Sequence, residues 1–426
     1  MPGVILAAPA SGAGKTTVTL GLLRAFRDRG VQVRGAKSGP DYIDPRFHEA
    51  ASGLSCPNLD AWAMPPTVTA GLASGPGLLL IEGAMGLFDG APPDGRGAVA
   101  DLARDLSLPV VLVVDAARMA QSIGPLVAGF AGFDPLVRVA GVILNRVGSP
   151  RHEAMLRKAC PLPVLGALPR DPHLATPSRH LGLVQAQERA DLDAFLTHAA
   201  AQMAAHVDLE ALQAIAAPLP PARTPRCHPP AQRIALARDE AFAFAYPHLL
   251  DAWQRAGAEI STFSPLNDDA APDADLVVLP GGYPELHAGR LAGNHRFLAS
   301  LRDRPVYGEC GGYMVMGAGL VDADGTRHAM ADLLPLETSF AERKLHLGYR
   351  SLHADGGPFA GAWAAHEFHY ATTLRAEGTP LFTARDAEGT PLPPMGLRHG
   401  LACGSFAHLI WVNDGTMPQG SSLDGS

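Results

Sequence analysis

Short runs of apolar residues alternate with helix-like patterns from residue 4 to residue 193. The runs lack the apolar-polar alternation of a half-exposed strand, so they predict strands buried on both faces. A pattern of helical period at 18–29 separates the first two runs. Together these features predict an α/β domain in which helices cover a parallel sheet. The expected strands are 4–8, 31–36, 78–82, 110–115 and 139–145.

Proline becomes frequent between 205 and 230, and the strand and helix alternation then restarts. Proline at this density is typical of an interdomain linker. Apolar runs at 233–237, 275–279 and 305–307 predict a second α/β domain with its own sheet. A chain of 426 residues also exceeds what one hydrophobic core usually serves. We therefore expect domains at 1–204 and 231–414, joined by a linker at 205–230 and followed by a flexible tail at 415–426.

Composition narrows the possible partners of the protein. The formal net charge is -8 and the basic residues are dispersed, which disfavours a nucleic-acid surface. No apolar stretch approaches the length of a membrane span, and the apolar start lacks the basic residues of a signal peptide. Five scattered cysteines without a Cys-x-x-Cys pair argue against a disulfide framework or a zinc site. We expect a cytoplasmic protein that binds neither nucleic acid nor membrane.

The segment 9–17 follows the first expected strand and has the features of a phosphate-binding loop. Its small residues let backbone N–H groups point at one anion, and the following helix adds a favourable dipole. Lys15 would neutralise phosphate charge and Thr16 would bind Mg²⁺. Pro9 stands where the usual pattern has its first glycine, and a plain glycine-rich turn is the alternative. The predicted ATP contacts in this loop are Gly12, Gly14, Lys15, Thr16 and Thr17.

Polar residues also follow three other expected strands, at the sheet edge where ligands collect. Lys37 and Asp41 follow the second strand, and Asp44 there is equally well explained by turn chemistry. Glu82 ends the third strand and suits a Mg²⁺ site, with turn capping as the alternative. Asn145 has the donor and acceptor needed to read an adenine edge, although a turn asparagine is about as plausible.

A strand, a sharp turn and a helix are expected over 305–314, with Cys310 at the turn. Such an elbow exposes a thiol at a helix N-terminus, so Cys310 is the candidate nucleophile. Gly282 and Gly311 would supply the N–H groups of an oxyanion hole, and His408 is the candidate base. The alternative is that Cys310 is an inert buried residue.

These motifs together resemble the cobyrinic acid or hydrogenobyrinic acid a,c-diamide synthases of corrin biosynthesis. The first domain also resembles dethiobiotin synthetase, which implies Mg²⁺ contacts from Thr16, Asp41 and Glu82 and an adenine contact from Asn145. The second domain resembles class I glutamine amidotransferase domains. The segments that carry the resemblance are 11–17, 37–45, 82–90, the turn at Cys310 and 365–370.

The resemblance implies an ATP- and glutamine-dependent ligase. ATP would phosphorylate a tetrapyrrole carboxylate, Cys310 would release ammonia from glutamine, and two rounds would give an a,c-diamide. A homodimer is a further expectation. The usual amidotransferase acid two residues after the histidine is replaced here by Ile410, and Glu367 and His369 have no assigned role. The predicted substrate contacts are Lys37, Asp41, Tyr42 and Asp89, with Arg46 as a further basic group.

Three other interpretations remain open at this point. The first is a related amidoligase with both domains. The segment 39–42 favours the a,c-diamide enzyme over cobyric acid synthase, whereas nickel-sirohydrochlorin diamide synthase is more similar and harder to exclude. A partitioning-type ATPase switch would carry a second lysine early in the loop, where Ala10 stands here. In the third, Cys310 is structural and the enzyme depends on free ammonia.

Overall fold

The computed structural model describes residues 2–174, 178–179, 182–183, 185–223 and 225–413. The chain forms two compact units, Met1–Pro225 and Arg226–Ser426. This division lies within the segment predicted as a linker, but the first part of that segment belongs to the first unit. There helix α8 (Leu209–Ile215) buries Leu209 and Leu212 against the first unit's core, so the limit expected at residue 204 is too early. The predicted tail at 415–426 lies outside the described residues.

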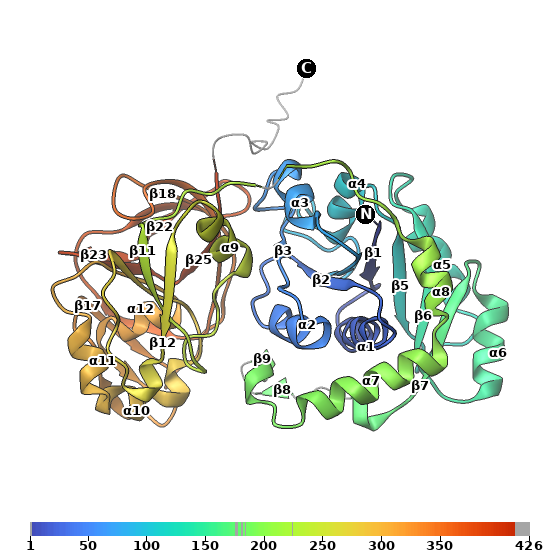
Figure 1. Cartoon of the computed structure of the whole chain (residues 1–426), viewed down its shortest axis with the longest axis horizontal. Helices are drawn as coiled ribbons and strands as arrows, with labels where there is room; N and C mark the ends of the chain where they lie inside the picture. The colour runs from blue at the N-terminus through green and yellow to red at the C-terminus, as the bar shows by residue number, and fades with distance from the viewer. Residues whose placement is uncertain (1, 175–177, 180–181, 184, 224, 414–426) are drawn as a thin grey trace, which may run out of the picture. The chain divides into compact units, whose positions relative to one another are not determined.

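The first unit contains the predicted parallel sheet (Figure 1). Its strands lie in the order β3-β2-β4-β1-β5-β6-β7, all parallel, and a short strand, β10, pairs antiparallel with the start of β1. All five predicted strands are confirmed. The strands are β1 (Pro2–Ala7), β2 (Val33–Ser38), β3 (Asn58–Leu59), β4 (Leu78–Glu82), β5 (Val110–Asp115), β6 (Val139–Val147), β7 (Val164–Pro169) and β10 (Ala217–Pro218).

Two hydrophobic cores lie on opposite faces of this sheet. Val4 and Leu6 of β1 contribute to one core, and Ile5 and Ala7 contribute to the other, so the strand is buried on both sides. One core includes residues of α1 (Lys15–Asp28), α2 (Asp44–Ser52), α7 (Leu192–His206) and α8. The other includes residues of α3 (Pro66–Ala73), α4 (Val99–Leu106), α5 (Ile123–Gly132) and α6 (Pro150–Ala159). The first unit also contains the short elements η1 (Pro172–Leu174), β8 (Ser178–Arg179), β9 (Gly182–Leu183) and η2 (Ala186–Glu188).

The second unit contains a separate α/β sheet in the order β12-β11-β13-β14-β24-β23. The strands pair in parallel, except that β23 pairs antiparallel with β24. The three strands predicted for this half are confirmed as β11, β13 and β14. The strands are β11 (Arg233–Ala237), β12 (Glu259–Phe263), β13 (Leu276–Leu279), β14 (Val306–Glu309), β23 (Leu397–His399) and β24 (Ala402–Ser405). The helices are α9 (Pro247–Arg255), α10 (Ala288–Gly293), α11 (His295–Ser300) and α12 (Gly311–Val315), with short turns η3 (Pro265–Asn267) and η4 (Pro284–His287).

Two further sheets of the second unit were not predicted. Most of their strands mix polar and apolar residues, so they lack the signal that identified the buried strands. One sheet has the order β16-β15-β17-β20, built from β15 (Gly317–Val321), β16 (Arg327–Ala329), β17 (Leu334–Ser339) and β20 (Thr372–Ala376). The other has the order β22-β21-β18-β19-β25, built from β18 (His346–Ala354), β19 (Gly361–His369), β21 (Phe382–Arg385), β22 (Pro391–Met395) and β25 (Ala407–Val412).

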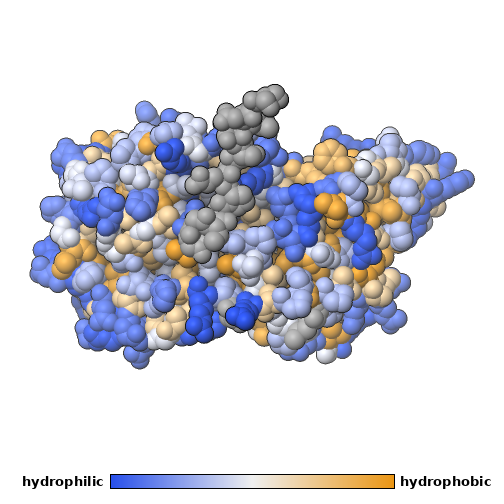
Figure 2. Space-filling model, turned by 90° about the horizontal axis from the view of Figure 1, so that it is seen from above, coloured by the Kyte–Doolittle hydropathy of each residue, from blue (hydrophilic) through white to orange (hydrophobic). Residues whose placement is uncertain are grey.

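Hydrophobic and hydrophilic residues are mixed over the face that Figure 2 displays. Several large apolar side chains are exposed to solvent, among them Phe133 and Leu136 between α5 and β6. Among the described residues, no helix is both long enough and apolar enough to cross a membrane.

Candidate active sites

The phosphate loop between β1 and α1 has the backbone geometry that its glycines predict. Gly12 and Gly14 have φ angles of 80° and 89°, which favour glycine over other residues. A Cβ atom on Gly14 would lie 2.3 Å from Nδ2 of Asn145, so there is no room for a side chain. Asn145 Nδ2 donates a hydrogen bond to the carbonyl of Ala13 at 2.9 Å. The amide of Asn145 therefore holds the loop, and its predicted adenine contact stays a prediction.

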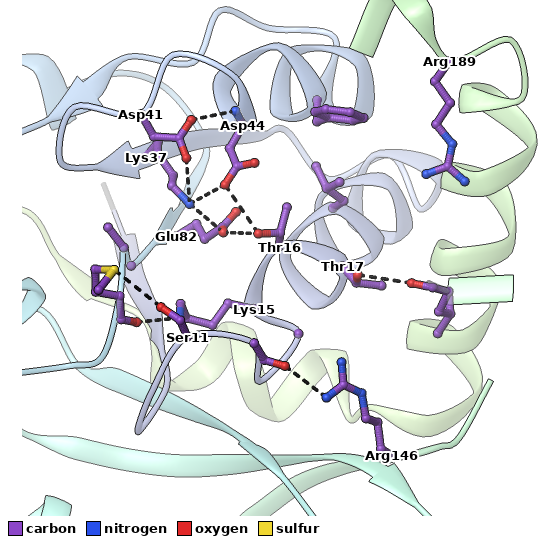
Figure 3. A pocket seen from close by; sticks show the side chains of 18 residues that line it. Ser11, Lys15, Thr16, Thr17, Lys37, Asp41, Asp44, Glu82, Arg146 and Arg189 are labelled. Carbon is purple, nitrogen blue, oxygen red and sulfur yellow. Dashed lines mark hydrogen bonds and ion pairs between the residues drawn. The ribbon is translucent and has the colours of Figure 1, made fainter. Parts of the chain in front are cut away.

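A cavity of about 490 Å³ opens at the phosphate loop (Figure 3). It is lined by the loop and by residues from the carboxyl ends of β2 and β4, as expected for parallel strands. Asn145, Tyr42 and Asp89 are not among the lining residues of the described chain. The predicted residues that do line the cavity are Gly12, Gly14, Lys15, Thr16, Thr17, Lys37, Asp41 and Glu82.

Lys37 lies at the centre of a buried cluster of charged side chains at one end of this cavity (Figure 3). Its Nζ atom is 2.5 Å from Asp44 Oδ2 and 2.7 Å from Glu82 Oε1. Thr16 Oγ1 donates to the same Glu82 oxygen at 2.6 Å. Asp41 Oδ2 lies 3.9 Å from Lys37 Nζ, and Asp41 Oδ1 accepts the backbone N–H of Asp44. Residues from α1, β2, α2 and β4 therefore meet at one point.

Burial and charge act against each other in this cluster. Burial favours the neutral form of Glu82, but the charge of Lys37 and the hydrogen bond from His48 hold its pKa well below the ordinary value. Burial raises the pKa of Asp44 to about 7, together with the charge of Asp41. Burial alone would lower the pKa of Lys37, but Asp44 and Glu82 raise it well above its ordinary value. Glu82 and Lys37 are therefore charged at neutral pH.

Asp44 and His48 were not among the predicted site residues. Turn chemistry and a functional role were equally plausible for Asp44, which stands beside Pro45, and the structure buries this residue in contact with Lys37. His48 is fully buried, and its Nε2 atom lies 2.6 Å from Glu82 Oε2. The position of His48 one turn after Asp44 on α2 is the sequence signal that would have found it.

The acidic side of the cluster fits a magnesium ion. Thr16, Asp41, Asp44 and Glu82 offer only oxygen atoms, the ligand type that Mg²⁺ prefers. Asp44 Oδ1 is buried and accepts no hydrogen bond from the described residues, so it has a free coordination position. Lys15 lies on the opposite side of the loop, where its Nζ atom donates to the Met85 carbonyl at 2.5 Å. Burial and the charge of Lys37 lower the pKa of Lys15.

Cys310 occupies a strained turn between β14 and α12. Its φ angle of 45° and ψ angle of -106° are unusual for a residue with a side chain. The N–H of Cys310 donates to the Ser405 carbonyl at 2.8 Å, which fixes the turn on the neighbouring strand β24. Backbone strain of this kind is typical of nucleophile elbows. The predicted elbow is therefore present.

His408 lies beside Cys310, although 98 residues separate them in the chain. A Cβ atom built on Gly281 would be 3.2 Å from Cys310 Cβ and 3.2 Å from His408 Nε2, so both side chains flank this glycine. His408 is fully buried on β25, which pairs with β19. Burial lowers the pKa of His408 to about 3, so its imidazole is neutral at physiological pH.

Glu309 occupies the side of His408 where an amidotransferase acid is expected. Its Oε2 atom lies 3.8 Å from His408 Nδ1, and its Oε1 atom accepts the N–H of Leu409 at 3.1 Å. The Tyr307 hydroxyl also donates to Oε1, at 3.2 Å. Glu309, which directly precedes Cys310, is thus the acid that lies beside His408, whereas Ile410 stands at the position where the amidotransferase acid is usual. Sequence analysis did not select Glu309, and its position beside Cys310 at the end of a strand was the available signal.

The predicted oxyanion residues lie against each other at the same turn. A Cβ atom on Gly311 would be 3.0 Å from the backbone nitrogen of Gly282, so the two main chains are in close contact. Burial raises the pKa of the Cys310 thiol, as does the charge of Glu285, whereas the N–H of Gly311 lowers it. The N–H of Gly311 therefore faces the sulfur. Whether Gly282 and Gly311 stabilise an oxyanion stays a prediction.

The segment that carries Glu367 and His369 also reaches this turn. The Phe368 carbonyl is 3.8 Å from Cys310 Sγ. Glu367 pairs with Arg350 at 2.7 Å and with His369 Nε2 at 3.0 Å, and the ring of His346 stacks on His369. Ligand atoms of His346, Glu367 and His369 lie within 4.8 Å of one another. Because Arg350 already neutralises Glu367, we interpret this cluster as a hydrogen-bonded wall beside the thiol.

Comparison with known proteins agrees with the division into two units. Residues 4–184 match the model of the "CobQ/CobB/MinD/ParA nucleotide binding domain" family. Residues 233–416 match that of the "CobB/CobQ-like glutamine amidotransferase domain" family.

Full-length relatives are similar over both units. The chain is 59% identical to hydrogenobyrinate a,c-diamide synthase of Brucella abortus, with 96% of this chain and 98% of that protein covered. The enzymes of the same name from Rhizobium meliloti and Rhodobacter capsulatus are 55% and 54% identical, each with 96% of this chain covered. The alignments include 99% of the Rhizobium meliloti enzyme and 98% of the Rhodobacter capsulatus enzyme.

Proposed function

Because the chain belongs to the hydrogenobyrinate a,c-diamide synthase family, we propose that it amidates the a and c carboxylates of hydrogenobyrinic acid with ATP and glutamine. The observation that carries this proposal is the identity of 59% over 96% of the chain, spanning both the nucleotide and the glutamine domains. The two sites supply the two chemistries that such a reaction needs: activation of a carboxylate and release of ammonia.

In the first unit, the phosphate loop binds ATP and the cavity receives the carboxylate. Lys15 and Lys37 stabilise negative charge on the transferring phosphoryl group. Thr16, Asp41 and Glu82, with Asp44 beside them, would hold Mg²⁺, which neutralises phosphate charge when bound. Phosphorylation converts a carboxylate oxygen, which is a poor leaving group, into phosphate. Of the proposed substrate contacts, Lys37 and Asp41 line the cavity, whereas Tyr42 and Asp89 do not.

In the second unit, Cys310 attacks the side-chain amide of glutamine. His408 takes the thiol proton and gives it to the departing ammonia. The backbone N–H groups of Gly282 and Gly311 stabilise the tetrahedral oxyanion. Water then hydrolyses the thioester to glutamate, and the ammonia displaces phosphate from the activated carboxylate. Glu309 holds His408 in orientation and stabilises the imidazolium form that appears during the reaction.

The direct test measures ADP and glutamate release with MgATP and glutamine, with and without hydrogenobyrinic acid. Mass spectrometry of the tetrapyrrole should show two successive losses of about one dalton, as NH₂ replaces OH twice. Stimulation by cobyrinic acid or nickel sirohydrochlorin instead would favour the related synthases. If no tetrapyrrole stimulates ATP turnover, the corrinoid assignment is wrong, and nucleotide-driven dimerisation would support the partitioning-type ATPase.

We further propose a cytoplasmic homodimer. The five cysteines are free, which suits a reducing compartment. Light scattering coupled to gel filtration would measure the mass of the particle, and a monomer mass would contradict the dimer.

A further inference from the structure

Glu285 is a buried acid that the reaction as described does not use. It lies in η4, three residues after Gly282, and only 9% of its surface is exposed to solvent. Neither carboxylate oxygen accepts a hydrogen bond from another residue in the described part of the chain. Burying a charged carboxylate without a partner costs several kcal/mol. A buried acid without a hydrogen-bond partner therefore indicates a site where a bound ligand would supply that partner.

The surroundings of Glu285 place it in the glutamine site. Helix η4 packs against α12, the helix that begins directly after Cys310. A Cβ atom on Gly311 would lie 2.8 Å from Cδ of Pro284, the residue that precedes Glu285. After burial, the charge of Glu285 has the largest effect on the Cys310 thiol. The charge of Arg343, an exposed residue, lowers the pKa of Glu285 and so acts against the effect of burial.

A small cation would complete this site, because both carboxylate oxygens of Glu285 are without a hydrogen bond from another described residue. Glutamine carries an α-ammonium group four bonds from its amide carbon, on the order of 5 Å when extended. When the amide carbon is at Cys310, the ammonium group can therefore reach a carboxylate close enough to act on the thiol, as Glu285 does. An ammonium group donates three hydrogen bonds and would satisfy both buried oxygens of Glu285.

We propose that Glu285 is the subsite for the α-ammonium group of glutamine. This inference rests on the proposed glutaminase function of the second unit. It has a consequence for the nucleophile. Burial raises the pKa of Glu285 to about 8, and when ionised the carboxylate opposes ionisation of Cys310. The bound ammonium group favours the ionised carboxylate and cancels its charge, so glutamine binding does not oppose ionisation of the thiol that attacks it.

A substrate analogue that lacks the α-amino group distinguishes binding of the ammonium group by Glu285 from a purely structural role of this residue. We would measure glutamate release from glutamine, and glutarate release from 4-carbamoylbutanoate, by wild-type enzyme and by Glu285→Gln. The wild-type enzyme should prefer glutamine in kcat/KM by on the order of 10- to 100-fold more than the variant does, because a charged hydrogen-bonded pair is lost. An unchanged preference in the variant would overturn the proposal. Glu259→Gln, at an exposed position on β12, removes the same charge and should keep the wild-type preference.

A labelling experiment needs no turnover and tests the subsite even if the proposed reaction is wrong. Cys310 would be alkylated by a chloroketone analogue of glutamine that keeps the α-amino group, and by iodoacetamide, which lacks it. Glu285→Gln should slow only the chloroketone by about 10-fold or more and should leave iodoacetamide as fast or faster. Equal slowing of both reagents would indicate a misfolded turn and would overturn the assignment. Normal labelling with both reagents would also overturn it.

Discussion

His408 Nδ1 lies 3.8 Å from Glu309 Oε2, and Glu309 directly precedes Cys310, the proposed nucleophile. The other carboxylate oxygen is held by the N–H of Leu409 and the hydroxyl of Tyr307, so the side chain has a fixed orientation. Acid, base and nucleophile therefore meet although the usual acid position holds Ile410. The separation of 3.8 Å is longer than a hydrogen bond, and catalytic contacts often shorten when substrate binds.

Substitution Glu309→Gln should lower kcat for glutamine-driven glutamate release by about 100-fold, because the imidazolium form of His408 loses its partner. Burial raises the pKa of Glu309 to about 8. The acid is needed in its charged form, so wild-type activity should rise as the pH passes upward through about 8. The variant should lack this rise. A pH profile of kcat that is the same in both proteins would contradict the role of Glu309.

Substitution Cys310→Ala should abolish glutamine-driven amidation and preserve the reaction driven by ammonium chloride, since the first unit holds the ATP site. ADP release and product mass would be measured with each nitrogen source. Cys403→Ala is the matched control, because Cys403 is also buried but lies in the middle of β24. Unchanged glutamine-driven turnover in the Cys310 variant would show that Cys310 is structural.

Substitution Gly14→Ala should weaken ATP binding by at least about 10-fold. The new Cβ atom would lie 2.3 Å from Asn145 Nδ2 and the φ angle of 89° is strained for alanine, so the loop must change shape. Gly30→Ala is the control, since Gly30 has a similar φ angle of 77° but no atom within 4 Å of its Cβ position. Titration calorimetry with MgATP measures both variants. If the Gly14 and Gly30 variants bound MgATP with equal affinity, the close contact between Gly14 and Asn145 would not matter for the shape of the loop.

Substitution Lys37→Met should destabilise the first unit by about 3 kcal/mol at pH 7, because it removes the buried cation that pairs with both Glu82 and Asp44. Urea denaturation measures this loss, and Lys158→Met on the exposed face of α6 is the control. Lys37 holds the folded pKa of Glu82 below its ordinary value of about 4.3. The stabilisation is therefore present above that pH and should be lost as the pH falls toward the lowered pKa. A loss that does not depend on pH would argue against the ion pair.

The sequence by itself determined the strands whose apolar runs are continuous and the motifs that follow them. β4 and β5 begin and end where the pattern predicted, because a strand buried on both faces must be apolar throughout. The phosphate loop and the turn at Cys310 were also predictable, since each depends on glycines and a reactive residue close together in the chain. A loop of this kind is specified by consecutive residues and can therefore be recognised in the sequence.

Only the tertiary structure decided which distant side chains meet. Glu309 and His408 are 99 residues apart in the chain. They come together because β14 ends at Glu309, whose carboxylate accepts the N–H of Leu409 in β25. The sequence left a turn and a functional role equally plausible for Asp44, which contacts Lys37, and it gave no role to Glu285. The role of a carboxyl group depends on burial and on its partners, which no local pattern specifies. Long-range packing therefore determined how the acids of both sites are used.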